Sequence, residues 1–416
     1  MKRYLIIGNG IAGTTAAEQI RKRDAEGEII LLTKESLPLY SRIRLPDFIC
    51  DKIFEDDLVI KNQEWHDKHN IRLIRGIEIE RIDFQGKKAF VKNGDHIKKS
   101  YNEDMSQPID MFDFDSLLLA VGSKSFIPPI KGTDQGGVVS LRTVDDAKII
   151  IKEIRIERGN TKEVVAIGGG LLGLEAAAAM IHAGVKVTVV ESCDRLLPRQ
   201  LDYQGAKLLQ LFLEKMGFVF RLGESTEEII GEISENAQKL ASILKGLKLK
   251  PQVTGVKLKS GDIIKADTLL FSAGVRPDLS LILNSGIKTD KGILVNERME
   301  TSIPSIYAAG DVAEYQGINF CIWTEAMEQG RVAGINMSGG SETYKNIPQS
   351  NILKIAGISL ASAGEIDVED KMDADIFSTE SVYRKIVKDN SGNIVGCIMI
   401  GDTTDFNKIV QKIKGE

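Results

Sequence analysis

Two stretches decide the fold: YLIIGNGIAGTTAAEQIRKR at residues 4–23 and VVAIGGGLLGLEAAAAMIHA at residues 164–183. Each begins with four apolar residues, continues through a G-x-G-x-x-G motif and ends in a run of helical character. A second apolar run follows each stretch, at residues 29–32 and 187–190. One such motif is weak evidence, but two copies, each between a predicted strand and a predicted helix, indicate two dinucleotide-binding units.

Each glycine of the motif has its own physical reason. The first makes a tight turn, the second lets the backbone approach a pyrophosphate, and the third lets the helix pack closely on the strand. The phosphates are expected at the helix N-terminus, where unpaired backbone N–H groups and the helix dipole favour negative charge. The predicted glycines are Gly8, Gly10 and Gly13 in the first unit and Gly168, Gly170 and Gly173 in the second.

A carboxylate after the second strand of such a unit can accept hydrogen bonds from the adenosine ribose. Glu191 closes the apolar run at 187–190 and is the candidate in the second unit. In the first unit Thr33 has the equivalent position, and Glu35 is the first carboxylate available. Glu35 is therefore the candidate there, with an exposed loop glutamate as the alternative.

A second repeat supports the same organisation. Residues 117–122 and 269–274 each form an apolar run that ends in a small-residue turn, at Gly122 and Gly274, and each follows its glycine motif at a similar distance. We read both as buried strands after which the chain could cross between domains. Two polar stretches, residues 92–113 and 231–252, are expected to be surface excursions without chemistry.

The composition excludes several classes of protein. The 416 residues are 43% hydrophobic and 27% charged with a formal net charge of -5, which is typical of a globular protein and disfavours disorder or general nucleic-acid binding. No apolar run approaches the roughly 18 residues that span a bilayer, and the N-terminus does not resemble a secretory signal. We therefore expect a cytoplasmic protein that binds neither nucleic acid nor membrane.

The cysteines and histidines give no support for a metal site. Cys50, Cys193, Cys321 and Cys397 form no C-x-x-C or C-x4-C pair, which disfavours a local metal site or a redox dithiol. His66 and His69 have a ligand-like spacing, but no acid or cysteine cluster accompanies them. A surface helix is the favoured interpretation of that pair, and no metal ligand is predicted.

Residues 301–311, TSIPSIYAAGD, resemble the second flavin fingerprint of the glutathione-reductase-like flavoproteins. Ala120-Val121-Gly122 and the run from Ala273 to Pro277 add to this resemblance, with Val121 where the family usually has threonine. The resemblance implies that the first glycine motif binds FAD and the second binds NAD(P)H. It also implies that Asp311 holds the ribityl chain of the flavin.

Residues 37–45, 323–331, 354–358 and 401–405 look like those of the NADH:rubredoxin oxidoreductases and the flavin module of NADH-dependent nitrite reductases. This resemblance implies that Arg42 lies near the flavin or its pyrophosphate, a solvated loop residue being the alternative. A helix that begins near Trp323 would point its N-terminus at the flavin pyrimidine. Glu175 would lie between nicotinamide and flavin, although a structural role in its helix is an equal alternative.

The expected fold class is α/β, with two Rossmann-like dinucleotide-binding domains and a small α+β C-terminal domain. The predicted FAD-binding domain comprises residues 1–122 and 275–345, the NAD-binding domain residues 123–274, and the C-terminal domain residues 346–416. No Arg or Lys directly follows Glu191 to receive the 2′-phosphate of NADPH, which favours NADH, although Arg195 is close in sequence.

The expected function is the transfer of electrons from NADH through FAD to an external one-electron acceptor. Related peroxidases and oxidases have a reactive cysteine where this sequence has Ile43, so no cysteine is expected to carry electrons. The acceptor would be a small carrier such as rubredoxin or a partner redox subunit. An NADH oxidase or peroxidase, or a flavin-bound assembly or sensor subunit, is the alternative, and the oligomeric state stays open.

Overall fold

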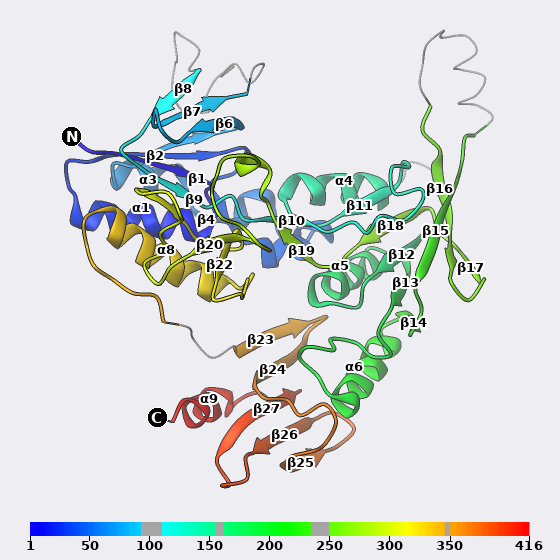
Figure 1. Ribbon diagram of the computed structural model, residues 1–416. Coiled ribbons are helices and arrows are strands. Elements are labelled where there is room, and N and C mark those ends of the chain that lie inside the picture. Colours follow the sequence, from blue (N-terminus) through cyan, green and yellow to red (C-terminus); the bar gives the residue numbers. More distant parts are fainter. Residues whose placement is uncertain (93–109, 155–161, 235–248, 346–349, 416) are drawn as a thin grey trace. The chain divides into compact units, whose positions relative to one another are not determined.

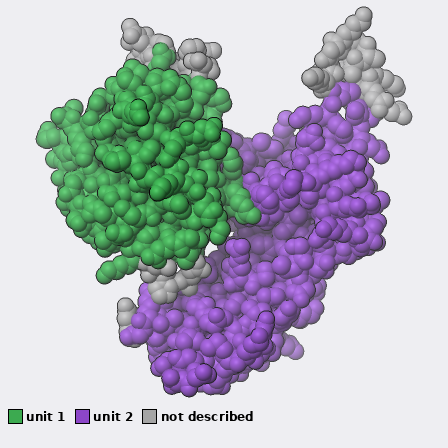
Figure 2. Space-filling model, in the orientation of Figure 1, with its two compact units in different colours: residues 1–41, 55–124, 275–347 green, residues 42–54, 125–274, 348–416 purple. Residues whose placement is uncertain are grey.

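The computed structural model describes residues 1–92, 110–154, 162–234, 249–345 and 350–415 (Figure 1). The chain groups into two compact units, coloured separately in Figure 2. Unit 1 holds residues 1–41, 55–124 and 275–347, and unit 2 holds residues 42–54, 125–274 and 348–416. The limits given above for the FAD-binding, NAD-binding and C-terminal domains stay predictions.

Unit 1 is built on a parallel sheet with the strand order β21-β9-β1-β2-β5. Residues 4–7 of β1 are apolar and buried, as expected of a strand that is covered on both faces of a parallel sheet. The strands are β1 Arg3–Ile7, β2 Glu28–Thr33, β5 Arg72–Arg75, β9 Ser116–Leu119 and β21 Ile306–Ala308.

Helices cover one face of this sheet, and an antiparallel sheet covers the other. Tyr4 and Ile6 share a core with α1 (Ile11–Arg23) and α8 (Trp323–Met337). Leu5 and Ile7 point to the other face, because successive side chains of a strand alternate, and share a core with the antiparallel sheet β6-β7-β8. The strands of that sheet are β6 Ile79–Asp83, β7 Lys88–Val91 and β8 Met111–Asp113.

Helices α1 and α8 lie side by side in Figure 1, and two glycines of α8 permit this contact. A Cβ atom added at Gly330 would lie 2.3 Å from the backbone oxygen of Ala12. One added at Gly334 would lie 2.5 Å from the backbone oxygen of Ala16. Only glycine lets the two backbones come so close.

Unit 2 repeats this plan with a parallel sheet of order β11-β18-β12-β13-β14. Val165 and Leu269 of this sheet share a core with Val253 and Val256 of the antiparallel sheet β15-β16-β17. Helix α5 (Leu171–His182) follows β12, as α1 follows β1. The strands are β11 Val138–Ser140, β12 Glu163–Ile167, β13 Lys186–Glu191, β14 Val219–Leu222, β15 Thr226–Glu232, β16 Gln252–Leu258, β17 Ile263–Lys265 and β18 Thr268–Phe271.

The C-terminal part of unit 2 is an antiparallel sheet of order β23-β24-β27-β26-β25 with one helix, α9 (Phe406–Lys414). Phe406 and Ile409 of α9 pack on Ala361, Met399 and other residues of one sheet face. The predicted fold class, with two parallel sheets and a smaller α+β part, is confirmed. The strands are β23 Ser350–Ile355, β24 Ile358–Gly364, β25 Asp373–Ser378, β26 Tyr383–Lys388 and β27 Ile394–Ile400.

The other elements are shorter pairs of strands and connecting helices. The strand pairs are β3 Leu39–Tyr40 with β4 Val59–Lys61, β10 Ser123–Ser125 with β19 Val275–Pro277, and β20 Ile293–Val295 with β22 Ala313–Tyr315. The helices are α2 Leu45–Ile49, α3 Gln63–Lys68, α4 Val144–Ile154 and α6 Tyr203–Lys215, with 3-10 turns at η1 Arg42–Arg44, η2 Glu55–Leu58 and η3 Ser280–Ile282.

Most of the two predicted surface excursions, residues 93–109 and 235–248, lie outside the described residues. Within the described ranges, no helix combines the length and the apolar character that crossing a membrane requires.

Replacing Gly330 with valine should lower the free energy of unfolding by about 1–3 kcal/mol, because overpacking a close helix contact forces the backbones apart. Chemical denaturation followed by circular dichroism measures this change. Met327→Ala is the matched control, since Met327 is on the same helix and is 44% exposed, and it should stay within about 0.5 kcal/mol of the unsubstituted protein. Equal midpoints for both variants would contradict the α1–α8 contact.

Candidate functional site

In unit 1 the loops that carry the predicted residues leave the sheet at one edge. Ile7, Leu119 and Ala308 are neighbours at the carboxyl ends of β1, β9 and β21, and Leu32 of β2 pairs with Ile7. Ligands of open parallel sheets bind outside this edge. The predicted residues that follow these strands are Gly8, Glu35, Gly122 and Asp311.

The glycines of the first motif occupy three different environments. Gly8 has a φ of +115°, and a Cβ atom there would lie 2.0 Å from the backbone oxygen of Ala120. A Cβ atom at Gly13 would lie 2.0 Å from the backbone oxygen of Gly8. By contrast, a Cβ atom at Gly10 would meet nothing within 4 Å. The protein itself therefore requires the first and third glycines, whereas the space at the second suits the approach of a ligand.

The N-terminus of α1 has the donors that a pyrophosphate needs. Gly10 is the N-cap residue, and no side chain among the described residues caps the helix. Asn9 is buried, its Oδ1 atom accepts a hydrogen bond of 2.8 Å from the Thr14 hydroxyl, and its Nδ2 atom has no partner among the described residues. Backbone N–H groups and one amide N–H are thus available at the end of the helix that favours anions.

The second motif repeats this geometry in unit 2. Gly168 has a φ of +108°, and a Cβ atom there would lie 2.3 Å from the backbone oxygen of Ser272. A Cβ atom at Gly173 would lie 2.8 Å from the backbone oxygen of Gly168, whereas one at Gly170 would meet nothing within 4 Å. Gly170 is also the N-cap residue of α5, again without a side-chain cap among the described residues.

Glu191 ends β13 beside this motif, and the backbone orients its carboxylate. The Gly169 N–H donates to Oε2 at 2.6 Å, and the Cys193 N–H donates to Oε1 at 2.8 Å. The Ser192 hydroxyl adds a bond of 3.1 Å to Oε1. These donors hold the charge at the edge of the sheet where a ribose is expected.

Arg195, the cation that left the choice of NADH over NADPH in doubt, is engaged elsewhere. Its Nε atom donates to the backbone oxygen of Leu201 at 3.3 Å, and its Nη2 atom donates to that of Pro198 at 3.1 Å. The guanidinium also lies 4.6 Å from the centre of the Tyr203 ring. The side chain is only 15% exposed, so it supports the loop that follows Glu191.

The acid of the first unit has a different environment from Glu191. Glu35 Oε2 accepts a hydrogen bond of 2.5 Å from the Tyr40 hydroxyl, and the Glu35 N–H donates to Thr33 Oγ1 at 3.2 Å. Its ribose contact stays a prediction.

Asp311 follows β21 and is oriented from the neighbouring loop. The Ser123 hydroxyl donates to Asp311 Oδ2 at 2.6 Å, and the preceding Gly310 N–H donates to Oε1 of buried Gln329 at 2.9 Å. Helix α8 begins at Trp323, the residue expected near its start. Contacts of Asp311 and Trp323 with a flavin stay predictions.

Gly122 and Gly274 follow the equivalent strands β9 and β18 and have positive φ of +74° and +91°. Such backbone angles favour glycine. The N–H of Asp278 donates to the Gly122 oxygen at 3.0 Å, and that of Phe126 donates to the Gly274 oxygen at 2.9 Å.

Arg42 belongs to unit 2. Its Nη1 atom donates to the backbone oxygen of Arg142 at 2.6 Å. Arg142 precedes a capping box of α4, in which Asp146 Oδ2 accepts from the Thr143 N–H at 2.8 Å and Thr143 Oγ1 accepts from the Asp146 N–H at 3.2 Å. Arg42 therefore supports the start of α4, and its contact with a flavin stays a prediction.

Glu175 lies on α5 and has a structural partner. Its Oε1 atom accepts a hydrogen bond of 2.8 Å from the backbone N–H of Ala356, in the turn between β23 and β24. Burial raises the pKa of Glu175, and the bond from Ala356 opposes this rise. The predicted role at the nicotinamide stays open beside this structural one.

Residues 2–333 match the family described as pyridine nucleotide-disulphide oxidoreductase. The chain belongs to that family. Residues 350–416 match a second description, rubredoxin NAD+ reductase C-terminal domain. The resemblance inferred from the sequence is therefore confirmed.

Individual relatives cover the whole chain. A nitrite reductase [NAD(P)H] of Bacillus subtilis is 32% identical over 100% of this chain and 47% of its own length. An NADH-rubredoxin oxidoreductase of Clostridium acetobutylicum is 31% identical over 99% of this chain and 94% of its own length. The crystal structure of NADH:rubredoxin oxidoreductase from that organism superposes with a TM-score of 0.75 at 29% identity, covering 100% of this chain and 95% of that one.

The chain spans about half the length of several curated relatives that it matches. Members of this family use FAD and a pyridine nucleotide, which agrees with the predicted cofactors. The two glycine motifs of this chain fit such ligands, because each provides a helix N-terminus with space at its second glycine.

The family name refers to a disulphide, but none of the four cysteines, all of which lie in the described ranges, forms one. Burial raises the pKa of the Cys397 thiol to about 11 and also raises that of Cys193, which disfavours the reactive thiolate in both. Cys50 donates to the backbone oxygen of Asp47 at 3.5 Å. Ile43 is 71% exposed.

His66 lies within α3, and His69 is the C-cap residue of that helix. His66 is buried and its Nδ1 atom lies 2.8 Å from the backbone oxygen of Asn62, while His69 stacks on Trp65 with ring centres 4.2 Å apart. Among the described residues, no group of three or more His, Cys, Asp or Glu side chains could hold a metal ion.

The sequence did not single out the buried polar residues behind Asp311. Gln329 of α8 accepts the Gly310 N–H, and the Tyr344 hydroxyl donates to the buried carboxylate of Glu325, one turn earlier on the same helix. Burial raises the pKa of Glu325. A polar residue on the apolar face of a helix is the signal that could have identified Gln329 and Glu325.

Replacing Gly10 with valine should remove FAD while unit 1 stays folded, because a Cβ atom there fills ligand space and meets no protein atom. Flavin absorbance per chain measures occupancy, and circular dichroism measures folding. Gly13→Val is the matched comparison, since a Cβ atom there meets the Gly8 oxygen at 2.0 Å, and it should lose both flavin and fold. A folded Gly10→Val protein with full flavin content would contradict the assignment.

Proposed function

We propose that this chain is an FAD-dependent NADH oxidoreductase that passes electrons to an external one-electron acceptor. The acceptor is a small carrier such as rubredoxin or a partner redox subunit. One observation carries the proposal: two glycine motifs lie at the carboxyl edges of two parallel sheets, in a chain whose cysteines offer no dithiol. The names of two relatives support it, an NADH-rubredoxin oxidoreductase and an assimilatory nitrate reductase electron transfer subunit.

Unit 1 would hold FAD at the N-terminus of α1. Gly10 would leave room for the pyrophosphate, Asp311 would hold the ribityl chain, and Glu35 would accept hydrogen bonds from the ribose. The N-terminus of α8 at Trp323 would stabilise negative charge at the flavin pyrimidine. When bound, FAD supplies the ability to accept a hydride and to release the two electrons singly.

Unit 2 would bind NADH at the N-terminus of α5. The Glu191 carboxylate, held by the N–H groups of Gly169 and Cys193, would accept hydrogen bonds from both ribose hydroxyls. The same carboxylate would repel the 2′-phosphate of NADPH, and Arg195 is too engaged by Pro198 and Leu201 to receive that phosphate. Glu175 would orient the nicotinamide carboxamide.

An NADH oxidase is the second candidate, because an NADH oxidase of Methanocaldococcus jannaschii is 31% identical over 87% of this chain and 76% of its own length. A cytoplasmic location, expected from the sequence, belongs to the proposal as well.

Anaerobic titration of the flavin-loaded protein with NADH should bleach the flavin with about one NADH per FAD and then stop, because no dithiol takes up further electrons. Turnover with NADH should then proceed with rubredoxin or ferricyanide at least about tenfold faster than with oxygen alone. Comparable turnover with oxygen alone would favour the oxidase. A flavin that NADH does not bleach would contradict both candidates.

Removing the Glu191 carboxylate should shift nucleotide preference. Glu191→Ala should raise the ratio of kcat/KM for NADPH to that for NADH by about 10- to 100-fold, and adding Ser192→Arg should raise it further by supplying a cation for the phosphate. Asp194→Ala is the matched control, because Asp194 is an acid of the same loop that faces Arg195. If Asp194→Ala shifts the ratio as much as Glu191→Ala, net charge and not the Glu191 position sets the preference.

A further inference from the structure

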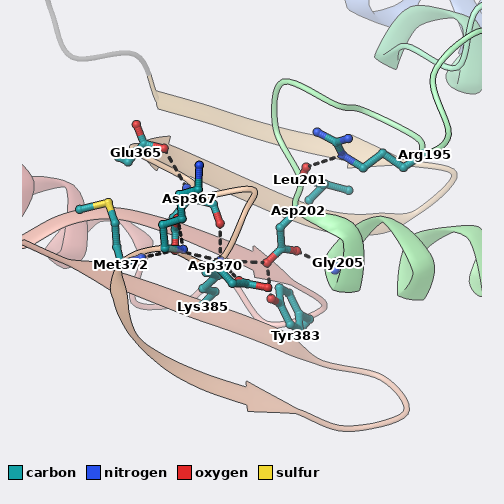
Figure 3. A network of polar contacts seen from close by, with 11 residues as sticks. Arg195, Leu201, Asp202, Gly205, Glu365, Asp367, Asp370, Met372, Tyr383 and Lys385 are labelled. Atoms are coloured by element: carbon teal, nitrogen blue, oxygen red, sulfur yellow. Dashed lines mark hydrogen bonds and ion pairs between the residues drawn. The ribbon is translucent and has the colours of Figure 1, made fainter.

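A buried polar cluster joins the C-terminal sheet to the nucleotide-binding part of unit 2 (Figure 3). Lys385 of β26 is fully buried, and its Nζ atom donates to the Asp367 backbone oxygen and to Asp370 Oδ1, both at 2.6 Å. The same atom lies 3.4 Å from Oδ2 of Asp202, the N-cap residue of α6. Lys385 thus links the C-terminal sheet to a helix of the parallel-sheet part.

Asp202 has partners in both parts. Its Oδ1 atom caps α6 by accepting the Gly205 N–H at 2.8 Å, and its Oδ2 atom accepts the hydroxyl of buried Tyr383 at 2.5 Å. Tyr383 and Lys385 alternate with Ile386, which packs toward α9, so both point to the opposite face of the sheet. A buried charge is strongly destabilising without its partner, so this cluster favours one placement of the sheet on α6.

The turn between β23 and β24 makes a second contact. Ala356 and Gly357 form a two-residue hairpin loop with φ of +50° and +90°. Loops of this kind favour Asn, Asp or Gly at the first position, so an alanine there is strained and is held by its surroundings. The hydrogen bond of 2.8 Å from the Ala356 N–H to Glu175 Oε1 holds this loop.

The contact of the C-terminal sheet with Asp202 and its contact with Glu175 lie next to two different parts of the proposed NADH site. Asp202 ends the loop that begins after Glu191, the predicted ribose ligand, and Arg195 inside that loop donates to Leu201 beside Asp202. Glu175 lies two residues after Gly173, the third glycine of the motif. The C-terminal sheet is therefore fixed to the adenosine side and touches the residue expected on the nicotinamide side.

We propose that the C-terminal sheet is a positioning element of the NADH site: Lys385 and Tyr383 anchor it on Asp202, and it thereby holds the Ala356 N–H against Glu175. This inference rests on the proposed function, because it assigns Glu175 to the nicotinamide. Lys385 and Tyr383 are positioning residues in this scheme, and neither touches the nucleotide.

The charge state of Glu175 gives the inference a second observable. The charged groups that act on its carboxylate are Asp47 and Lys52, in the segment around α2, and Lys354 on β23. The Ala356 N–H stabilises the ionised form, so loss of this bond raises the pKa of Glu175 further. A displaced sheet would then move the acid limb of any Glu175-dependent rate to higher pH.

The test compares Lys385→Met and the milder Tyr383→Phe with Lys388→Met, a lysine of the same strand that pairs with Asp375 of β25. Anaerobic stopped-flow of the flavin-loaded proteins should show NADH reduction slowed about tenfold in Lys385→Met and about threefold in Tyr383→Phe, with the acid limb moved to higher pH. Lys388→Met should stay within about twofold, and FAD content should be equal in all. Hydrogen exchange of residues 350–360 should quicken in the first two variants only.

A double-mutant cycle with Glu175→Gln decides whether the effect passes through Glu175. Lys385→Met should slow NADH reduction no further in the Glu175→Gln protein, and Tyr383→Phe should behave alike if Lys385→Met does not fold. Multiplied losses, or unchanged rate and exchange in folded Tyr383→Phe, would overturn the inference while leaving the proposed function intact. Absence of NADH reduction in the unsubstituted protein would instead overturn the proposed function and this inference with it.

Discussion

The close approach of two loop backbones at the first glycine of each motif is the constraint on which both units depend. The Ala120 backbone oxygen lies so close to Gly8, and the Ser272 backbone oxygen so close to Gly168, that each glycine has room for a hydrogen atom but not for a Cβ atom. This approach brings the turn after the first strand against the turn after its neighbour, β9 or β18. The helix that follows then starts at the carboxyl edge of the sheet, and its free N–H groups define where a phosphate can bind.

Local sequence was sufficient for the parts of the fold in which near neighbours cooperate. The strand, glycine turn and helix of each unit, and the place of Glu191 at the end of β13, all lie within about 30 residues of one another, which is the span of a βαβ motif. The start of α8 at Trp323 was also predicted, in this case from family resemblance. In each unit the residues that form the strand, the turn and the helix are the same residues that make up the sequence motif.

Contacts between distant segments could not be predicted in this way. Gly330 is needed because of Ala12, and Lys385 can be buried because Asp202 faces it from the N-terminus of α6. The local sequence does not reveal either partner: Gly330 and Gly334, one helical turn apart, indicate a close contact but not with which segment, and the residues around Lys385 do not indicate Asp202. The hydrogen bonds of Arg195 could not be predicted from the sequence either, because they go to backbone oxygens, which every residue has.

The sharing of Asp202 between helix and sheet also limits how this chain can be divided. Leu360, Ile398 and Ile400, which are fully buried, lie on the sheet face opposite α9, by the alternation of β24 and β27. Asp202 and Lys385 therefore belong to one buried cluster, to which α6 and the C-terminal sheet both contribute. A division of the chain before the C-terminal sheet would open this cluster and expose to water three polar side chains, those of Asp202, Tyr383 and Lys385, that are buried in the whole chain.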